Sequence, residues 1–357
     1  MYSSKSALAK LKPEIGARLF METLLHDDGV DFFGGETLLL LGDLGGGKTT
    51  LLMHIAQWSR YIEEINKNVY VNAVLYHQSK NEKMPAGYPV PKPETVIIRG
   101  GKHDNWSAVL PEYYNKNYPY KKKCFLYVHE NDNIKFWHLK NGKKTRIFYL
   151  PEIKKYSDAN QLKNLIGFNP GAIHIVYEPS NYRLNLEFWL RFRGKSLETV
   201  TKAEKKRLKD MPVAPVIFWF EFFETLLRER DFGHVTVEID EAHQMCPAGA
   251  RGDRWHLNEW FINNAVIKGR KNNLTLILAT QQQSQLDYRL IVPLANTVYL
   301  KGAHIPKSSM IRYKAITGGL KPGLGLIEKR NDRFGPITFP RLEKQPPVVF
   351  AEGVHDM

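Results

Sequence analysis

Cysteines and long apolar runs are scarce in this sequence. Only Cys124 and Cys246 occur in 357 residues, and neither stands among residues with metal-ligand spacing. We therefore expect no disulfide framework, and a reducing cytoplasm fits the sequence. No stretch reaches about 18 uninterrupted apolar residues, and residues 1–20 lack the apolar core of a signal peptide, so we expect no membrane span.

Acidic residues are also in deficit. The chain has 37 Asp and Glu against 51 Lys and Arg, which gives a formal net charge of +14. A surplus of this size attracts polyanions, so a nucleic acid or an anionic membrane surface is a candidate partner. The hydrophobic content of 43% and the charged content of 25% are ordinary for a soluble globular protein.

Short apolar runs alternate with segments of helical spacing along most of the chain. The runs that predict buried strands are residues 36–42, 69–76, 95–100, 172–179, 234–240, 274–280 and 296–302. Helices are expected at residues 49–65, 196–211, 214–229 and 257–272, and a final hairpin at residues 323–340. This alternation is typical of an α/β fold, in which helices cover both faces of a mostly parallel sheet.

Residues 101–165 differ in composition from the rest, being rich in Lys, Asn and Tyr. Turn signals at residues 131–133 and 141–143 separate alternating aromatic segments, which predicts an antiparallel β-rich insertion. We therefore divide the chain into an N-terminal segment, a core in two parts, this insertion and a C-terminal tail. The N-terminal segment is residues 1–35, and the core comprises residues 36–100 and 166–345. The insertion is residues 101–165, and the tail is residues 346–357.

A glycine-rich octapeptide follows the first predicted strand and opens the first predicted helix. It matches the phosphate-binding pattern G-x-x-x-x-G-K-[ST] in the context that the pattern requires. Its glycines let backbone N–H groups face a β-phosphate at the positive end of the helix dipole. Lys48 is expected to reach the β- and γ-phosphates, and the Thr49 hydroxyl to ligate Mg²⁺. The predicted cofactors are ATP and Mg²⁺, and the predicted nucleotide-binding residues are Gly42, Gly45, Gly46, Gly47, Lys48, Thr49 and Thr50.

Two acids end the strand predicted at residues 234–240. Asp240 would lie at the carboxyl edge of the sheet beside the glycine-rich loop, where it could hold Mg²⁺. Glu241 would polarise the attacking water. The alternative is an acidic pair at a strand end on the surface. Glu238 shares the face of Asp240, and the sequence suggests no role for it.

Two further side chains are candidates for catalysis. Gln281 is the first polar residue after the strand at 274–280, where it could sense the γ-phosphate; otherwise it caps a loop. Arg270 ends a predicted helix. Its position alone favours a cation that complements the helix C-terminus, and the sharper reading is a cation that enters a neighbouring subunit's site.

Three segments together resemble the FtsK–HerA superfamily of ring-forming DNA motors. They are GDLGGGKT, IDEAH and GRKNNLTLILATQQQSQLD, and the third is similar to conjugative coupling proteins. The resemblance implies a RecA-like P-loop NTPase core, a sensor at Gln281 and a trans-acting arginine at Arg270, with Lys271, Arg251 or Arg254 as substitutes. IDEAH also looks like HerA-type and zonula-occludens-toxin-like phage assembly ATPases.

Several parts typical of those families are not recognised in the sequence. They are the membrane helices of coupling proteins, the β-barrel of HerA proteins and the DNA-reading winged helix of FtsK. The remaining minimal motor resembles the genome-packaging ATPases of membrane-containing and archaeal viruses. The resemblance implies an ATP-driven translocase that moves double-stranded DNA without sequence preference. Viral genome packaging and plasmid transfer are the two processes that fit it. It implies a homo-oligomeric ring, with a hexamer favoured, in the host cytoplasm or a virion.

Two other functions stay open. One is a virion or pilus assembly ATPase that acts on protein. The other is a small-molecule NTP-dependent enzyme such as a kinase, which predicts a monomer without need of Arg270. Glu241 beside Asp240 argues against the kinase, because it supplies a base for water.

The insertion is the first candidate for a DNA surface. Its lysines could meet phosphates or simply be solvated, and its aromatics could stack on bases or form a small core, which we favour. The residues concerned are Lys121, Lys122, Lys123, Lys135, Lys140, Lys143, Lys144, Arg146, Tyr118, Tyr120, Phe136 and Trp137. The small, basic loop at residues 247–254 is a second candidate.

Overall fold

A computed structural model describes most of the residues of the chain. They are residues 21–22, 24, 35–88, 90–110, 122–180, 182, 188–190, 197–199, 201–202, 216–228, 233–294, 296–329, 333–340, 342 and 347–354. Most of the helix predicted at 196–211 lies outside this set, as do Tyr118, Tyr120 and Lys121.

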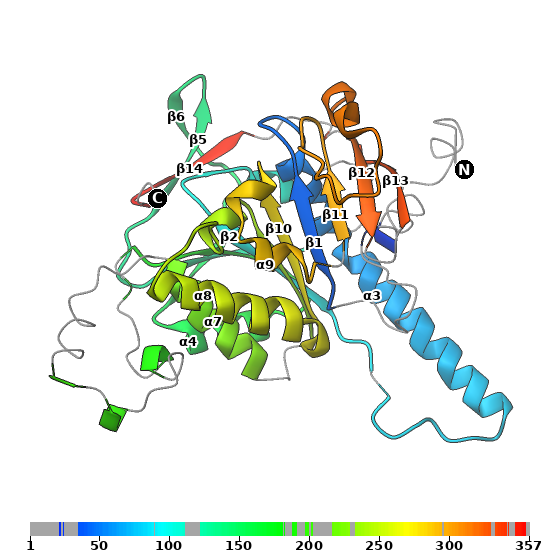
Figure 1. The fold of residues 1–357 in the computed structure, drawn as a ribbon. Helices are drawn as coiled ribbons and strands as arrows, with labels where there is room; N and C mark the ends of the chain where they lie inside the picture. The colour runs from blue at the N-terminus through cyan, green and yellow to red at the C-terminus, as the bar shows by residue number, and fades with distance from the viewer. Residues whose placement is uncertain are drawn as a thin grey trace.

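One ten-stranded sheet forms the centre of the molecule (Figure 1). Its order is β13-β12-β11-β1-β10-β9-β2-β8-β4-β7, and only β12, near one edge, runs antiparallel to the other strands. This confirms the predicted α/β class with a mostly parallel sheet. The strands are β1 (Thr37–Leu41), β2 (Glu94–Gly100), β4 (Cys124–His129), β7 (Glu152–Tyr156), β8 (Ile173–Tyr177), β9 (His234–Ile239), β10 (Leu274–Thr280), β11 (Asn296–Tyr299), β12 (Leu324–Lys329) and β13 (Arg333–Thr338).

Helices cover both faces of this sheet, because its strands are apolar on both sides. Leu39 and Leu41 of β1 pack into one core and Leu38 and Leu40 into the other, as the two-residue period of a strand requires. The first core is covered by α4 (Ala159–Gly167), α7 (Val216–Arg228), α8 (Asp253–Trp260) and the π-helix η5 (Phe261–Lys268). The second is covered by the first half of α3 (Lys48–Ser79) and by η1 (Trp106–Val109).

Helix α3 corrects one strand prediction. Residues 69–76 are rich in β-branched and aromatic side chains, yet they continue a 32-residue helix. Propensity is a weak prior, and no breaker interrupts the chain between Lys48 and this segment. The distal part of α3 projects away from the sheet (Figure 1), and Val71, Leu75 and Tyr76 are more than half exposed.

A second, four-stranded sheet stands beside the first. It comprises β3 (His103–Asp104), β14 (Val348–Glu352), β5 (Lys135–Lys140) and β6 (Lys143–Arg146), in that order. The turn at residues 141–143 is confirmed, because β5 and β6 form an antiparallel hairpin around it. The predicted meander is otherwise wrong: β4 and β7 lie in the main sheet, parallel to each other. Residues 348–352, predicted as part of a tail, supply the central strand β14.

The structure bears on the expectations about disulfides and membrane spans. Cys124 and Cys246 are free thiols. Within the described ranges, no helix combines the length and hydropathy needed to cross a bilayer.

Candidate nucleotide-binding site

The carboxyl ends of three neighbouring strands bring most of the predicted site residues together. Strand β1 pairs with β10 through Leu41 and Thr280, and β10 pairs with β9 through Leu278 and Ile239. The glycine-rich loop, Gln281 and Asp240 each follow directly from one of these strands. They therefore lie along one edge of the sheet, where α/β proteins bind their ligands.

The glycine-rich loop depends on backbone shapes that glycine supplies. Gly47 precedes α3 with a φ of 99°, in the left-handed region that other residues rarely adopt. At Gly46 an added Cβ would lie 2.9 Å from the carbonyl oxygen of Asp43 and 3.0 Å from that of Lys301. The loop is thus packed against the segment that follows β11. Leu44 at its tip is 83% exposed, and Thr50 is half-buried in the first turn of α3.

Lys48 lies inside this loop. Its side chain is buried, and Nζ donates hydrogen bonds to the carbonyl oxygens of Gly42 at 2.7 Å and Asp43 at 3.3 Å. A buried ammonium at the N-terminus of a helix can meet the β- and γ-phosphates of a nucleotide in the loop.

Thr49 and Asp240 meet as the sequence predicts for two Mg²⁺ ligands. The Thr49 hydroxyl donates to Asp240 Oδ2 at 3.3 Å, although 191 residues separate them. One hydroxyl and one carboxylate fit Mg²⁺, which takes few protein ligands and completes its shell with phosphate oxygens and water. In the described part of the chain, no three His, Cys, Asp or Glu side chains gather to hold a metal by themselves.

Asp240 and Glu241 have different surroundings. Burial raises the pKa of Asp240, and the backbone N–H of Glu241, which donates to Asp240 Oδ1 at 2.9 Å, opposes that shift. Glu241 has a φ of 51°, and its side chain is 39% exposed with Oε2 3.3 Å from His243 Nδ1. A left-handed conformation at a residue other than glycine costs free energy and is frequent at functional sites. It turns the Glu241 carboxylate out of the sheet, where water can reach it.

Glu238 is an unexpected acid in the core. It is fully buried on the Asp240 face of β9, and neither carboxylate oxygen has a hydrogen-bond partner among the described residues. Burial, followed by the nearby Asp240 charge, raises the pKa of Glu238 well above its usual range. Burial thus favours the protonated form of Glu238 over a second buried charge beside the metal-binding position.

Gln281 and Arg270 lie at opposite edges of the sheet. Gln281 is half-buried directly after β10, between the glycine-rich loop and Asp240. Arg270 precedes β10, where it donates to the carbonyl oxygen of Gly35 at 3.1 Å and pairs with the buried Glu36 at 3.2 Å. Strand β1 has five residues, about 17 Å at 3.3 Å per residue, and separates this pair from the loop. Arg270 therefore cannot reach the nucleotide site of its own chain.

A buried ion pair behind the site escaped the sequence analysis. Arg99, near the end of β2, donates to both carboxylate oxygens of Glu178 at 3.0 and 2.9 Å and to Gln244 Oε1 at 2.8 Å. Gln244 is three residues beyond Glu241, so the ion pair fixes the turn that carries Glu241. A single arginine within the apolar run at 95–100 was the only signal for it.

The basic loop at residues 247–254 is held mainly by its own arginine. Arg254, a substitute candidate for the trans-acting cation, donates to the carbonyl oxygens of Gln244 and Met245. Its guanidinium also lies 5.7 Å from the Phe220 ring centre. These contacts account for Arg254 as the anchor of the loop, whereas Arg251 is exposed.

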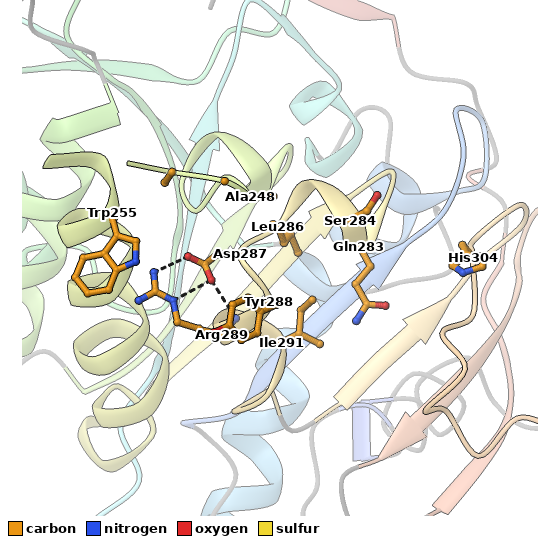
Figure 2. A pocket seen from close by; sticks show the side chains of 12 residues that line it. Ala248, Trp255, Gln283, Ser284, Leu286, Asp287, Tyr288, Arg289, Ile291 and His304 are labelled. Carbon is orange, nitrogen blue, oxygen red and sulfur yellow. Dashed lines mark hydrogen bonds and ion pairs between the residues drawn. The ribbon is translucent and has the colours of Figure 1, made fainter. Parts of the chain in front are cut away.

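The same loop borders an open cavity of about 640 Å³ (Figure 2). On the opposite side of the cavity, Asp287 accepts two hydrogen bonds from the Arg289 side chain, and that guanidinium lies 4.6 Å from the Trp255 ring centre. Ala248 N also donates to the carbonyl oxygen of Gln285 at 2.8 Å, so the loops that follow β9 and β10 are joined.

One part of the predicted DNA surface is wrong. Lys122 is buried, and its ammonium donates to the carbonyl oxygen of Glu94 instead of facing solvent. Of the aromatic side chains that were expected to form a small core, Phe136 does so, whereas Tyr118 and Tyr120 lie outside the described residues. Phe136 packs against Trp106 and Tyr177, with ring centres 6.1 and 5.1 Å apart, and so contributes to a core.

The order of strand, glycine-rich loop and helix, with Lys48 in the loop and Thr49 against Asp240, defines an α/β protein of the P-loop NTPase class. No protein-family profile matches the sequence, and no curated protein matches it.

Among solved structures, the chain is similar to the genome packaging NTPase B204 from Sulfolobus turreted icosahedral virus 2 in complex with ATP-gammaS. The TM-score is 0.39 at 11% identity, over 85% of this chain and 96% of that one. It is also similar to the cytoplasmic domain of the Thermomonospora curvata type VII secretion ATPase EccC. Here the TM-score is 0.32 at 12% identity, over 87% of this chain and 24% of that one. The N-terminal domain of zonular occludens toxin from Neisseria meningitidis has a TM-score of 0.28 at 12% identity, over 86% of this chain and 96% of that one.

Proposed function

We propose that this chain is an ATP-hydrolysing motor of the FtsK–HerA type that moves double-stranded DNA through a homo-oligomeric ring. The observation that carries the ATPase part is the meeting of Lys48, Thr49, Asp240 and Glu241 at one sheet edge. The ring rests on Arg270. The family resemblance assigns this residue a catalytic role, and its distance from the chain's own loop leaves only a neighbour's site for that role.

The chemistry follows from these positions. A water oxygen forms a bond to the γ-phosphorus, and the bond from that phosphorus to the oxygen bridging to the β-phosphate breaks, which leaves ADP and phosphate. Glu241 accepts the water's proton, and Lys48 offsets charge on the β- and γ-phosphate oxygens. Mg²⁺, held by Thr49 and Asp240, would neutralise further charge on those oxygens. Gln281, between the loop and the acids, would contact the γ-phosphate or the attacking water.

Lys48 provides the first test of nucleotide binding. Lys48→Ala removes the cation in the loop, and each charge-assisted hydrogen bond contributes roughly 1.5–3 kcal/mol. We expect ATP to bind at least about tenfold more weakly, measured by calorimetry, because about 1.4 kcal/mol is a factor of ten. Lys80→Ala, at the exposed far end of α3, serves as the control. Unchanged affinity for ATP in Lys48→Ala would refute the assigned site.

The experiment that separates the functions is the ATPase rate with and without duplex DNA, with a mass measurement in the presence of ATP. A DNA motor predicts faster hydrolysis with duplex DNA and a ring-sized mass. An assembly ATPase predicts a ring whose ATPase rate does not change when duplex DNA is added. A kinase predicts a monomer with little hydrolysis of ATP. Lys48→Ala, prepared in the same way, measures any contaminating ATPase.

DNA affinity should depend strongly on salt and weakly on sequence. Neutralised phosphates release counterions, so log K should fall linearly with log salt, by about 0.9 for each phosphate contacted. Titrations of two duplexes of unrelated sequence at several salt concentrations would measure the slope. Binding confined to one sequence, or absent at low salt, would contradict the translocase.

A further inference from the structure

The β5–β6 hairpin projects from the small sheet (Figure 1) and carries several exposed cations. Every residue of β6 is exposed, and the exposed cations of the hairpin are Lys135, Lys140, Lys143, Lys144 and Arg146. Lys144 is partly neutralised by Glu352 at 2.8 Å. No carboxylate of the described residues pairs with Lys140, Lys143 or Arg146. These three side chains can therefore meet an external polyanion without first breaking an ion pair.

The hairpin is joined by backbone pairing to the edge of the nucleotide site. Strand β5 pairs with β14, and β14 pairs with β3, where Val349 lies opposite Asp104. Strand β3 follows β2, whose pairing with β9 places Ile98 opposite Glu238 and so brings Gly100 level with Asp240. Asp104 is consequently placed on the side of the sheet where Asp240 lies. Burial, and to a smaller extent the Asp240 charge, raises the pKa of the Asp104 carboxyl to about 7.

Side chains make a second connection along the same route. Phe136 of β5 packs against both Trp106 and Tyr177. Trp106 Nε1 donates to the Tyr177 hydroxyl at 2.7 Å, and that hydroxyl donates to Asp104 Oδ2 at 2.8 Å. Trp106 and Tyr177 are each 1% exposed. Because both are packed inside the protein, a shift of Phe136 must displace them.

We infer that the β5–β6 hairpin is a contact surface for the phosphates of duplex DNA. A shift of the hairpin on binding DNA is transmitted to the ATP site through the contacts of Phe136, Tyr177 and Asp104. Asp104 is a positioning residue, because the strand register places it near Asp240. This inference rests on the proposed DNA motor and adds where DNA contacts the chain and how that contact changes hydrolysis. A coupling route needs a measured coupling free energy, which two variants and their combination supply.

The first variant tests the surface. Lys140→Gln, Lys143→Gln and Arg146→Gln together remove three cations from the hairpin. We expect weaker binding of a mixed-sequence duplex, and a salt slope smaller by about 2.7 at roughly 0.9 per phosphate contact. The matched control removes the same charge elsewhere on the surface, at Lys80, Lys83 and Lys307, all exposed. If the hairpin variant binds DNA as tightly as the parent, the contact surface is wrong. If it binds DNA no more weakly than the control variant does, the loss reflects net charge alone, and the contact surface is again wrong.

The second variant tests the connection. Tyr177→Phe keeps the ring against Phe136 and removes the hydroxyl between Trp106 and Asp104. We expect the basal ATPase rate and the DNA affinity to stay within about twofold of the parent, while stimulation by DNA falls to less than a third. Tyr156→Phe is the control, because it removes another buried hydroxyl that bonds to the carbonyl oxygen of Tyr177 at 2.6 Å. With the hairpin and Tyr177 variants combined, stimulation at saturating DNA should fall no further than in Tyr177→Phe alone.

The two proposals fail in different ways. If duplex DNA leaves the parent's ATPase rate unchanged, the DNA motor is wrong, and this inference fails with it. If DNA stimulates the parent, and Tyr177→Phe is stimulated equally or Tyr156→Phe loses the same stimulation, only the connection is wrong.

Discussion

Arg270→Ala is expected to lower the ATPase rate by about 10³–10⁵, the usual effect of removing an arginine that stabilises transition-state charge. Nucleotide binding should persist, because the glycine-rich loop and Lys48 lie at the other edge of the sheet. Steady-state hydrolysis and calorimetric ATP binding measure the two effects separately. A cation that serves only its own helix end would contribute about 0.3–1 kcal/mol and leave the rate nearly intact.

Glu36 offers the matched control for this variant, since Arg270 pairs with it in the same chain. Glu36→Gln removes the ion pair and leaves the arginine in place. If Arg270 acts in a neighbour's site, Glu36→Gln should lose stability without a comparable loss of rate. Equal losses of rate in both variants would show that the ion pair, and not a trans contact, supports hydrolysis.

Mixing adds an independent check of the ring. Neither Arg270→Ala nor Lys48→Ala should hydrolyse ATP alone. In a mixed ring, some interfaces join an intact loop of one subunit to an intact Arg270 of the next, so activity should return. The parent's specific activity should also fall on dilution as the ring dissociates. Activity that is constant down to a demonstrated monomer would overturn both the trans role and the ring.

Glu241→Gln is expected to bind ATP like the parent and to hydrolyse it about 10²–10⁴ times more slowly, because the amide cannot take the water's proton. Single-turnover hydrolysis, with binding measured in parallel, gives both values. His243→Gln is a useful control, because His243 lies beside Glu241 and has no assigned role in proton transfer. Rapid turnover by Glu241→Gln would show that another group activates the water.

The acids around Asp240 could be predicted only in part. Asp240 and Glu241 could be predicted as site residues because they end a strand, and ligand-binding groups usually lie at the carboxyl edge of a parallel sheet. Asp104 gave no such signal. It lies 136 residues before Asp240 in a lysine- and asparagine-rich segment, and it comes close only because β3 follows β2 and β2 pairs with β9.

The segment at residues 69–76 shows the limit of local patterns. Its composition favours a strand, and the structure makes it the outer part of α3. A strand needs a partner to satisfy its backbone hydrogen bonds, whereas a helix satisfies them within itself. Among the described strands, none is placed to pair with residues 69–76, and the helix that begins at Lys48 continues through them.

The sequence by itself determined the parts whose chemistry is local. The glycines shape the phosphate loop, the apolar runs other than residues 69–76 form strands, and the order of strands and helices gives a parallel sheet with its site at the carboxyl edge. Apart from the contact between Thr49 and Asp240, only the tertiary structure decided which distant residues meet. It set Arg270 against Glu36 at the far edge, made residues 348–352 the strand between β3 and β5, and joined the basic hairpin to Asp104. Local patterns specify backbone conformation, but contacts across a hundred or more residues depend on how whole elements pack, which no short stretch of sequence contains.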